Sequence, residues 1–245
     1  MELLLAADGI DVNKQNLHKR TALTYASEQG HTEVVEVLLR VNDICVNLHG
    51  KKNDTALIRA SRYGHEEIVE LLLGVDDIDV NAQGLKYHTA LIWASSEGHI
   101  KVVEHLLGSE GINLNLQTQM NNTALIRPSE EGHKEVVELL LGHRDIDVNF
   151  QGYLKNTALI WSCRCNHYEI VKLLLNFVGI NVNLQNKYGD TALMWACTNG
   201  HINIVELLLG FNSINVNLKN SIKNDTALMR ASREGHSAIV ELLLA

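Results

Sequence analysis

Residues 189–209 read GDTALMWACTNGHINIVELLL, and this stretch decides the fold. Thr-Ala-Leu followed by small and apolar residues predicts a short helix capped by Thr191, because a threonine hydroxyl accepts an unpaired backbone N–H. Gly200 stands where that helix must stop, since glycine readily adopts the left-handed conformation of a helix end. After His201, apolar residues at helical spacing predict a second short helix with one buried face.

The same pattern recurs along the whole chain. Thr-Ala-Leu begins at Thr21, Thr55, Thr89, Thr123, Thr157, Thr191 and Thr226, with a spacing of 34 residues that lengthens once to 35. A histidine lies ten residues after each threonine. The residue before this histidine is glycine in every repeat but one, where it is Asn166. An Ile-x-(Val/Leu)-Asn element ends at Asn13, Asn47, Asn81, Asn115, Asn149, Asn183 and Asn217. Neither helix is long enough to be stable alone, so successive pairs must bury their apolar faces against each other in a stack.

These features resemble the ankyrin repeat, in seven repeats of about 34 residues that cover the whole chain. The resemblance implies an all-α repeat solenoid, in which antiparallel helix pairs stack and β-hairpin or loop fingers protrude. It predicts a single domain over 1–245, with a partial repeat at 1–13 and a helix pair after each capping threonine. The chain also ends without a polar cap, so we expect a segment of a longer array or ends that stack on neighbours.

Two departures from the family pattern bear on the structure. The family's Thr-Pro-Leu-His becomes Thr-Ala-Leu followed by Thr, Ile or Met, so apolar contact must replace the hydrogen bonds which that histidine makes between repeats. The family's fingertip glycine is present only as Gly189, so we expect the fingers to differ in shape.

Pro128 stands inside an expected inner helix, where most other repeats have alanine. Proline removes a backbone hydrogen bond there, so we expect a kink that tilts Arg127 and its finger. A tolerated defect without functional effect is the alternative.

No feature of the sequence indicates catalysis. The polar residues are distributed one set per repeat, whereas a nucleophile, a base and an oxyanion hole must converge. Stacked helices lie about 8–10 Å apart, so the histidines cannot share one metal ion; we expect each to bond the local backbone. Cys163 and Cys197 fit a buried small-residue position, and Cys165 should be more exposed. We therefore expect no enzyme, no metal and no cofactor.

Charge and length exclude further classes. The formal net charge is −8, which argues against sequence-independent binding of nucleic acid. No apolar run approaches the length that spans a bilayer, and four cysteines are too few for a disulfide scaffold. We expect a reducing, cytoplasmic setting and no membrane contact; the nucleus and delivery into a host cell stay open as alternatives.

The charges divide sharply between the two sides of the repeats. The expected finger and inner-helix segments hold 16 of the 21 Lys and Arg but only 8 of the 29 Asp and Glu. The remaining segments hold 5 basic and 21 acidic residues. Such a separation steers an acidic partner toward the basic, finger-bearing side, which the family fold makes concave.

Aromatic residues concentrate on the same side, and Trp, Tyr and Arg are the residues most enriched at binding hot spots. The expected partner-binding residues on the inner helices are Tyr25, Arg59, Arg62, Tyr63, Trp93, Arg127, Trp161, Arg164, Trp195, Arg230 and Arg233. The expected contacts at the fingertips are Lys51, Lys52, Lys86, Tyr87, Tyr153 and Tyr188. A purely structural role, in which these side chains cover the neighbouring inner helix, is the alternative.

These observations favour a scaffold that binds a protein or peptide of acidic character along the concave face. The second hypothesis is a sensor of nucleotides or short oligonucleotides, because Trp alternating with Arg can stack bases and contact phosphates. The overall charge makes nucleic acid the less favoured partner.

Overall fold

The computed structural model describes residues 10–50 and 52–245. Residues 1–9, which hold most of the partial repeat expected at 1–13, lie outside the described residues, and so does Lys51.

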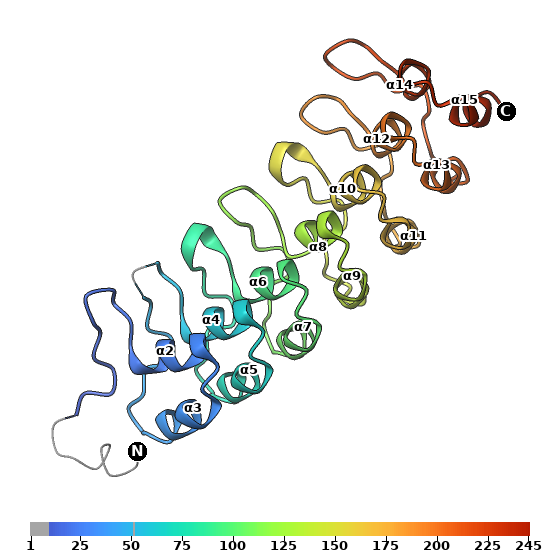
Figure 1. The fold of residues 1–245 in the computed structure, drawn as a ribbon. Coiled ribbons are helices and arrows are strands. Elements are labelled where there is room, and N and C mark those ends of the chain that lie inside the picture. The colour runs from blue at the N-terminus through green and yellow to red at the C-terminus, as the bar shows by residue number, and fades with distance from the viewer. Residues whose placement is uncertain (1–9, 51) are drawn as a thin grey trace. The chain divides into compact units, whose positions relative to one another are not determined.

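The chain divides into two compact units, Met1–Gln119 and Met120–Ala245. Within each unit, short helices pair and stack side by side, and a loop precedes each pair (Figure 1). We call this loop, which runs from the residue after the Ile-x-Val-Asn element to the residue before the capping threonine, the finger. The helical repeat solenoid predicted from the period is confirmed.

In the first unit, the inner helices α2, α4 and α6 pack against one another, and so do the outer helices α3, α5 and α7. The bounds are α2 (Ala22–Gln29), α3 (Thr32–Leu39), α4 (Ala56–Tyr63), α5 (Glu66–Leu73), α6 (Ala90–Ser96) and α7 (Ile100–Leu107), with a fingertip turn η1 (Leu85–Tyr87). Each inner helix also packs on the outer helix that follows it, so the apolar faces of all these helices close into one core.

The second unit repeats this arrangement with α8, α10, α12 and α14 as inner helices and α9, α11, α13 and α15 as outer helices. The bounds are α8 (Ile126–Glu131), α9 (Lys134–Leu141), α10 (Ala158–Arg164), α11 (Tyr168–Leu175), α12 (Ala192–Asn199), α13 (Ile202–Leu209), α14 (Ala227–Glu234) and α15 (Ser237–Leu244), with a fingertip turn η2 (Tyr153–Lys155).

Threonine caps and left-handed ends set the limits of the inner helices, as predicted. In every repeat but the fourth, the Thr Oγ1 accepts the N–H three residues on, at 3.2 or 3.3 Å. The glycine before each histidine has a positive φ, for example 75° at Gly200, and Asn166 adopts 62° in the one repeat without glycine. Local sequence therefore decides where these helices begin and end.

Proline changes the fourth repeat differently from the kink that we expected. Helix α8 begins only at Ile126, so Pro128 falls in its first turn, where a missing N–H needs no helical partner. The capping role of Thr123 is lost, and its buried hydroxyl has no hydrogen-bond partner among the described residues. The proline thus shortens the helix at its start instead of bending it.

The position of the family's histidine in Thr-Pro-Leu-His is apolar and buried in most repeats. Ile58, Ile92, Ile126, Ile160 and Met194 are each 1 % exposed, whereas Met229 in the last repeat is 52 % exposed. This burial confirms that apolar contact replaces the missing histidine.

Five of the seven histidines, His65, His99, His167, His201 and His236, bond backbone, but the acceptor lies in the preceding repeat. In the first unit, His65 and His99 approach the carbonyl oxygens of Glu28 and Arg62 through Nε2, at 3.0 and 3.1 Å. In the second unit, His167, His201 and His236 contact the carbonyls of Glu130, Arg164 and Thr198. A Cβ on Gly30 would come within 2.7 Å of the His65 ring, so this glycine also makes room for the neighbouring repeat. The expectation of a bond within the same repeat was wrong.

The asparagine that ends Ile-x-Val-Asn also ties repeats together. Asn47 donates from Nδ2 to the carbonyl of Asp77 at 2.7 Å, and its Oδ1 accepts the N–H of Asp79 at 2.9 Å. Asn13, Asn81, Asn149 and Asn183 make the same two bonds to the next repeat. The period is thus enforced at the outer loops as well as in the core.

The fingers are loops and contain no β-strand within residues 10–50 and 52–245. Neighbouring fingers share single backbone bonds, such as that from the Lys187 N–H to the Leu154 carbonyl at 2.8 Å, which are too few for a ladder. Side-chain amides complete the connection: Gln151 Nε2 donates to the carbonyls of Lys155, in its own finger, and Gln185, in the next. Gln15, Gln83 and Gln185 do the same.

Candidate functional site

The expected binding side chains lie on the inner helices and fingers, where the two units are built alike. One contact recurs between successive repeats and organises this surface. The seventh residue after a capping threonine lies against the fourth residue after the next capping threonine. The pairs in this register are Glu28 with Arg59, Arg62 with Trp93, Arg164 with Trp195, and Thr198 with Arg230. We call these the cross-repeat pairs.

The first cross-repeat pair is a buried ion pair. Arg59 is only 6 % exposed, and its guanidinium lies 2.8 Å from an Asp54 carboxylate oxygen and 3.6 Å from one of Glu28. Arg20 meets the same Glu28 at 2.9 Å, and its guanidinium lies over the Tyr25 ring. Since these carboxylates already neutralise Arg59, this residue holds the repeats together and offers little charge to a partner.

The second pair is an arginine on an indole. The Arg62 guanidinium carbon lies 4.1 Å from the centre of the Trp93 ring, and the His88 ring stacks on the same indole at 4.3 Å. Burial lowers the pKa of His88 from its ordinary value, which favours the neutral imidazole. Tyr63, which is 45 % exposed, lies beside Arg62 with 5.6 Å between guanidinium and ring.

In the second unit, Arg164 lies between two indoles. Its guanidinium carbon is 5.2 Å from the centre of the Trp161 ring and 4.5 Å from that of Trp195. Arg164 is exposed, while both indoles are only partly exposed. No carboxylate lies within ion-pairing distance of Arg62 or Arg164 among the described residues.

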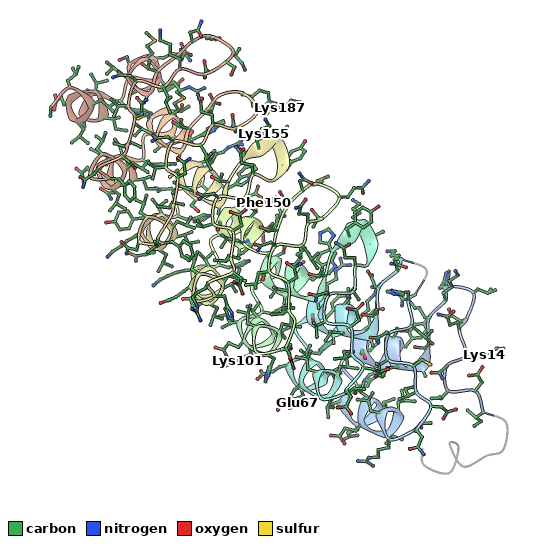
Figure 2. All side chains as sticks on the ribbon, turned by 180° about the vertical axis from the view of Figure 1, so that it is seen from behind. Lys14, Glu67, Lys101, Phe150, Lys155 and Lys187 are labelled. Carbon is green, nitrogen blue, oxygen red and sulfur yellow. The ribbon has the colours of Figure 1, made fainter. Side chains whose placement is uncertain are left out.

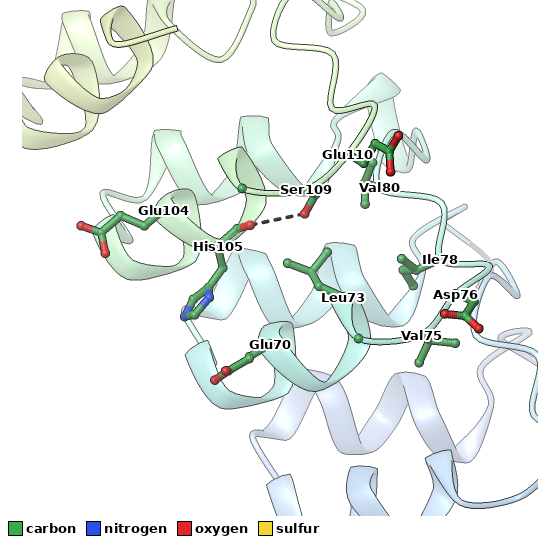
Figure 3. A pocket seen from close by; sticks show the side chains of 12 residues that line it. Glu70, Leu73, Val75, Asp76, Ile78, Val80, Glu104, His105, Ser109 and Glu110 are labelled. Atoms are coloured by element: carbon green, nitrogen blue, oxygen red, sulfur yellow. Dashed lines mark hydrogen bonds between the residues drawn. The ribbon is translucent and has the colours of Figure 1, made fainter.

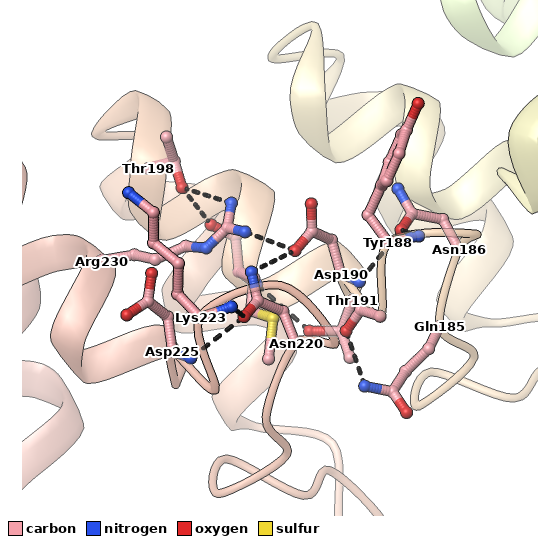
Figure 4. A network of polar contacts seen from close by, with 12 residues as sticks. Gln185, Asn186, Tyr188, Asp190, Thr191, Thr198, Asn220, Lys223, Asp225 and Arg230 are labelled. Atoms are coloured by element: carbon pink, nitrogen blue, oxygen red, sulfur yellow. Dashed lines mark hydrogen bonds and ion pairs between the residues drawn. The ribbon is translucent and has the colours of Figure 1, made fainter.

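The other inner-helix arginines are held by carboxylates. Arg127 pairs with Glu130 at 2.7 Å and with Glu131 at 2.6 Å. Arg230 pairs with Asp190 (Figure 4). Its guanidinium carbon lies 5.7 Å from the Trp195 ring centre.

The last of these arginines is also paired. Arg233 binds Asp225, which lowers the pKa of that carboxyl through the hydrogen bond. Most of the positive charge expected along the inner helices is therefore balanced within the protein.

The fingers carry the exposed charge. Every described finger lysine is exposed, and the set is Lys14, Lys19, Lys52, Lys86, Lys155, Lys187, Lys219 and Lys223. The finger carboxylates of Asp54, Asp190 and Asp225 are instead buried, at 3, 4 and 8 % exposure. Tyr87, Tyr153 and Tyr188 are exposed on the same loops, and Lys155 and Lys187 extend from the fingers of the second unit (Figure 2).

The opposite side of the first unit has a different character. A depression of about 690 Å³ there is bordered by the carboxylates of Glu70, Asp76, Glu104 and Glu110 (Figure 3). The outer loops are therefore acidic where the fingers are basic, as the charge distribution in the sequence indicated.

The described part of the chain has no cluster of metal-ligating side chains. It contains no group of three or more His, Cys, Asp or Glu residues placed to hold a metal ion, and no helix of it is long and apolar enough to cross a membrane. Burial raises the pKa of the Cys197 thiol to about 12 and also raises that of Cys163, so neither is a thiolate at neutral pH.

The sequence did not show which carboxylates and rings the arginines contact. The ion pairs of Arg127 follow the helical i, i+3 and i, i+4 spacing and were readable from the sequence. The Asp190–Arg230 pair joins different repeats and has no local signal. The stacking of His88 on Trp93 depends on how the finger returns to its helix, which the sequence pattern does not specify.

Comparison with known proteins agrees with this architecture. A family model described as "Ankyrin repeats (3 copies)" matches residues 1–84, 76–152, 149–220 and 177–245, which together span the chain. No curated protein matches it. On the evidence of these matches and of the stacked helix pairs, the chain belongs to the ankyrin repeat family.

Proposed function

We propose that this chain is a non-catalytic scaffold that binds an acidic segment of a partner protein on its inner-helix and finger face. Ankyrin repeats generally act as scaffolds for protein–protein interactions. The single observation that carries the acidic partner is the contrast within the fingers, where the lysines are exposed while the carboxylates are buried. An approaching chain therefore meets positive charge first.

Aromatic side chains next to this charge supply contact area. Tyr25, Tyr63 and Tyr87 are 39, 45 and 57 % exposed in the first unit, and Tyr153 and Tyr188 are 47 and 39 % exposed in the second. Tyrosine combines a large apolar ring with a polar tip and loses little entropy on binding. Exposed aromatics beside exposed cations fit a peptide segment in which acidic and apolar residues alternate.

The contacts of the indoles argue against oligonucleotide binding. Bases would have to stack on Trp161 or Trp195, but the guanidinium of Arg164 lies over both rings. The guanidinium of Arg62 and the imidazole of His88 lie on Trp93. Protein binding requires no such displacement, because a partner can contact the outer edges of these groups.

Charge reversal on the fingers tests the proposal. The 245-residue chain is used as bait in extract of its source cell, with the paired substitutions Lys155→Glu and Lys187→Glu in the second unit. We expect recovery of the bound protein to fall about tenfold, because like charges then face an acidic partner. The change at the exposed tips should leave the helical circular dichroism signal unaltered.

A matched control reverses two exposed lysines of the outer helices, with Lys101→Glu and Lys172→Glu. These variants change the net charge equally, so undiminished recovery with them would assign the effect to the fingers. Equal recovery with finger and outer-helix variants contradicts the proposal. Recovery that disappears after nuclease treatment would favour the oligonucleotide alternative.

A further inference from the structure

The inner helices hold four arginines whose guanidiniums are bound by the protein's own carboxylates. Arg59 takes Asp54 and Glu28, Arg127 takes Glu130 and Glu131, Arg230 takes Asp190, and Arg233 takes Asp225. Wherever a carboxylate is within reach, a guanidinium on these helices is paired with it. These internal pairs show which chemistry the helices accommodate.

Two arginines are the exception, and they occupy the same register position. Arg62 in the first unit and Arg164 in the second each lie on an indole of the following repeat, Trp93 and Trp195, at 4.1 and 4.5 Å. In the same register, the first cross-repeat pair has Glu28 against Arg59. Where that pair has a glutamate and an arginine, the other two pairs have an arginine and a tryptophan. These two pairs therefore contain no carboxylate that would balance the charge of the arginine.

The indole holds each guanidinium without neutralising it. A guanidinium over an aromatic face keeps its N–H groups at the ring edge, where they can form two parallel hydrogen bonds to a carboxylate. Because the stack already restricts the arginine side chain, binding orders less of the side chain than it would for an unrestrained arginine.

We propose that the Arg62–Trp93 and Arg164–Trp195 pairs are two equivalent seats, each of which binds one Asp or Glu side chain of the protein partner. This inference rests on the proposed function and specifies where the acidic residues of the partner dock. Each seat has one guanidinium, and at Trp93 the second stacked group is His88, whose pKa is lowered by burial. The ion-pair partners of the other four inner-helix arginines are all carboxylates, which favours an Asp or Glu side chain as the ligand of these two guanidiniums as well.

The experiment uses the 245-residue chain and two synthetic peptides with capped ends. One peptide alternates glutamate and leucine, and the other has glutamine in place of every glutamate. The chain contains three tryptophans, so the indole N–H signals of Trp93, Trp161 and Trp195 can be followed one by one by NMR. We expect the glutamate peptide to shift the signals of Trp93 and Trp195, and the glutamine peptide to bind about tenfold more weakly.

Single substitutions assign each seat. Arg62→Gln should abolish the response of Trp93 and leave that of Trp195, and Arg164→Gln should do the reverse. Arg40→Gln and Arg144→Gln remove the same charge outside the inner face and should leave both responses intact. Arg62→Lys, which keeps the charge but loses the planar fork, should weaken the Trp93 response and guards against a folding defect in the glutamine variant.

The outcomes separate this inference from the function on which it rests. If both peptides shift backbone signals of the inner helices and fingers equally, the face binds protein but the seats fail. If neither peptide binds there and a partner is recovered by another surface, the proposed function fails as well. An oligonucleotide that shifts Trp93 and Trp195 more strongly than the glutamate peptide does would overturn the assignment to carboxylates.

Discussion

At the fingertips, the backbone adopts a positive φ in all seven repeats, yet glycine occupies only one of these positions. The residues concerned are Lys19, Asn53, Tyr87, Asn121, Lys155, Gly189 and Asn224, with φ between 53° and 78°. A side chain in this region crowds the backbone, which asparagine tolerates better than lysine or tyrosine. The left-handed position is thus common to all seven fingertips, but Lys86 and Leu154 add a second left-handed residue in two of them, so the finger shapes differ as expected.

Replacing Lys155 by glycine should consequently stabilise the protein. Relief of the left-handed strain outweighs the extra freedom of glycine in the unfolded chain, so we expect Lys155→Gly to raise the free energy of unfolding by about 0.5–1 kcal/mol. Urea denaturation followed by circular dichroism measures the change. Gly189→Ala is the opposite control: its Cβ would come within 2.4 Å of the Ser221 nitrogen, so it should destabilise. A loss of stability in Lys155→Gly would contradict this account.

The role of a single residue was predictable where it depends on sequence neighbours, and not where it depends on a contact between repeats. Thr191 and Asn166 were assigned correctly from their neighbours, since caps and helix ends depend on the local chain. The partner of Arg230 could not be predicted, because Asp190 lies 40 residues away and the finger must first bring it there. Arg59 was expected at the surface and is buried for the same reason.

At the scale of elements, helix α8 is the one inner helix of the described chain that starts late. Its bounds are Ile126–Glu131, against Ala192–Asn199 for α12. The shift places Pro128 in the first turn and leaves the Thr123 hydroxyl without a partner among the described residues. The proline therefore lowers stability in two ways, because both the first helical turn and its threonine cap are lost.

Pro128→Ala should restore both features. With an N–H at position 128, the helix can begin at Ala124 under a Thr123 cap, and we expect the free energy of unfolding to rise by about 1–3 kcal/mol. Thermal and urea denaturation measure the gain. Ala94→Pro places proline at the equivalent position of α6 and should destabilise by a similar amount. Unchanged stability in Pro128→Ala would show that the late start has another cause.

The helices were predictable as elements, whereas the form of the fingers was not. Period, caps and apolar spacing all specified the helix pairs, because each signal acts within one repeat. The resemblance left β-hairpin or loop fingers open, and the fingers are loops that use Gln side chains such as Gln151 to reach neighbouring carbonyls. Side-chain bridging of this kind has no periodic signature that distinguishes it from an ordinary polar loop.

For the whole molecule, the net charge of −8 conceals two surfaces of opposite sign. The segments of fingers and inner helices hold 16 of the 21 cations, and the depression on the outer side of the first unit is bordered by carboxylates. Internal ion pairs reduce the contribution of the inner helices, so long-range attraction must come chiefly from the exposed finger lysines.

Association with an acidic partner should therefore depend on salt mainly through its rate. Between about 0.05 and 0.5 M NaCl, we expect the association rate constant for the glutamate–leucine peptide to fall about tenfold, with little change in dissociation. Stopped-flow measurement of tryptophan fluorescence gives both constants. The paired change Lys155→Glu and Lys187→Glu should flatten this dependence, while a change confined to dissociation would contradict steering by the fingers.

The two hydrogen bonds that each finger glutamine donates have a mechanical consequence. A single side-chain amide donates to one carbonyl of its own finger and one of the next finger in Gln15, Gln83, Gln151 and Gln185. A finger displaced by a binding peptide would therefore displace the next finger as well, because the two are hydrogen-bonded. Within a unit, the tips should thus move as a linked row, and seating the first acidic side chain would help to set the register for those that follow.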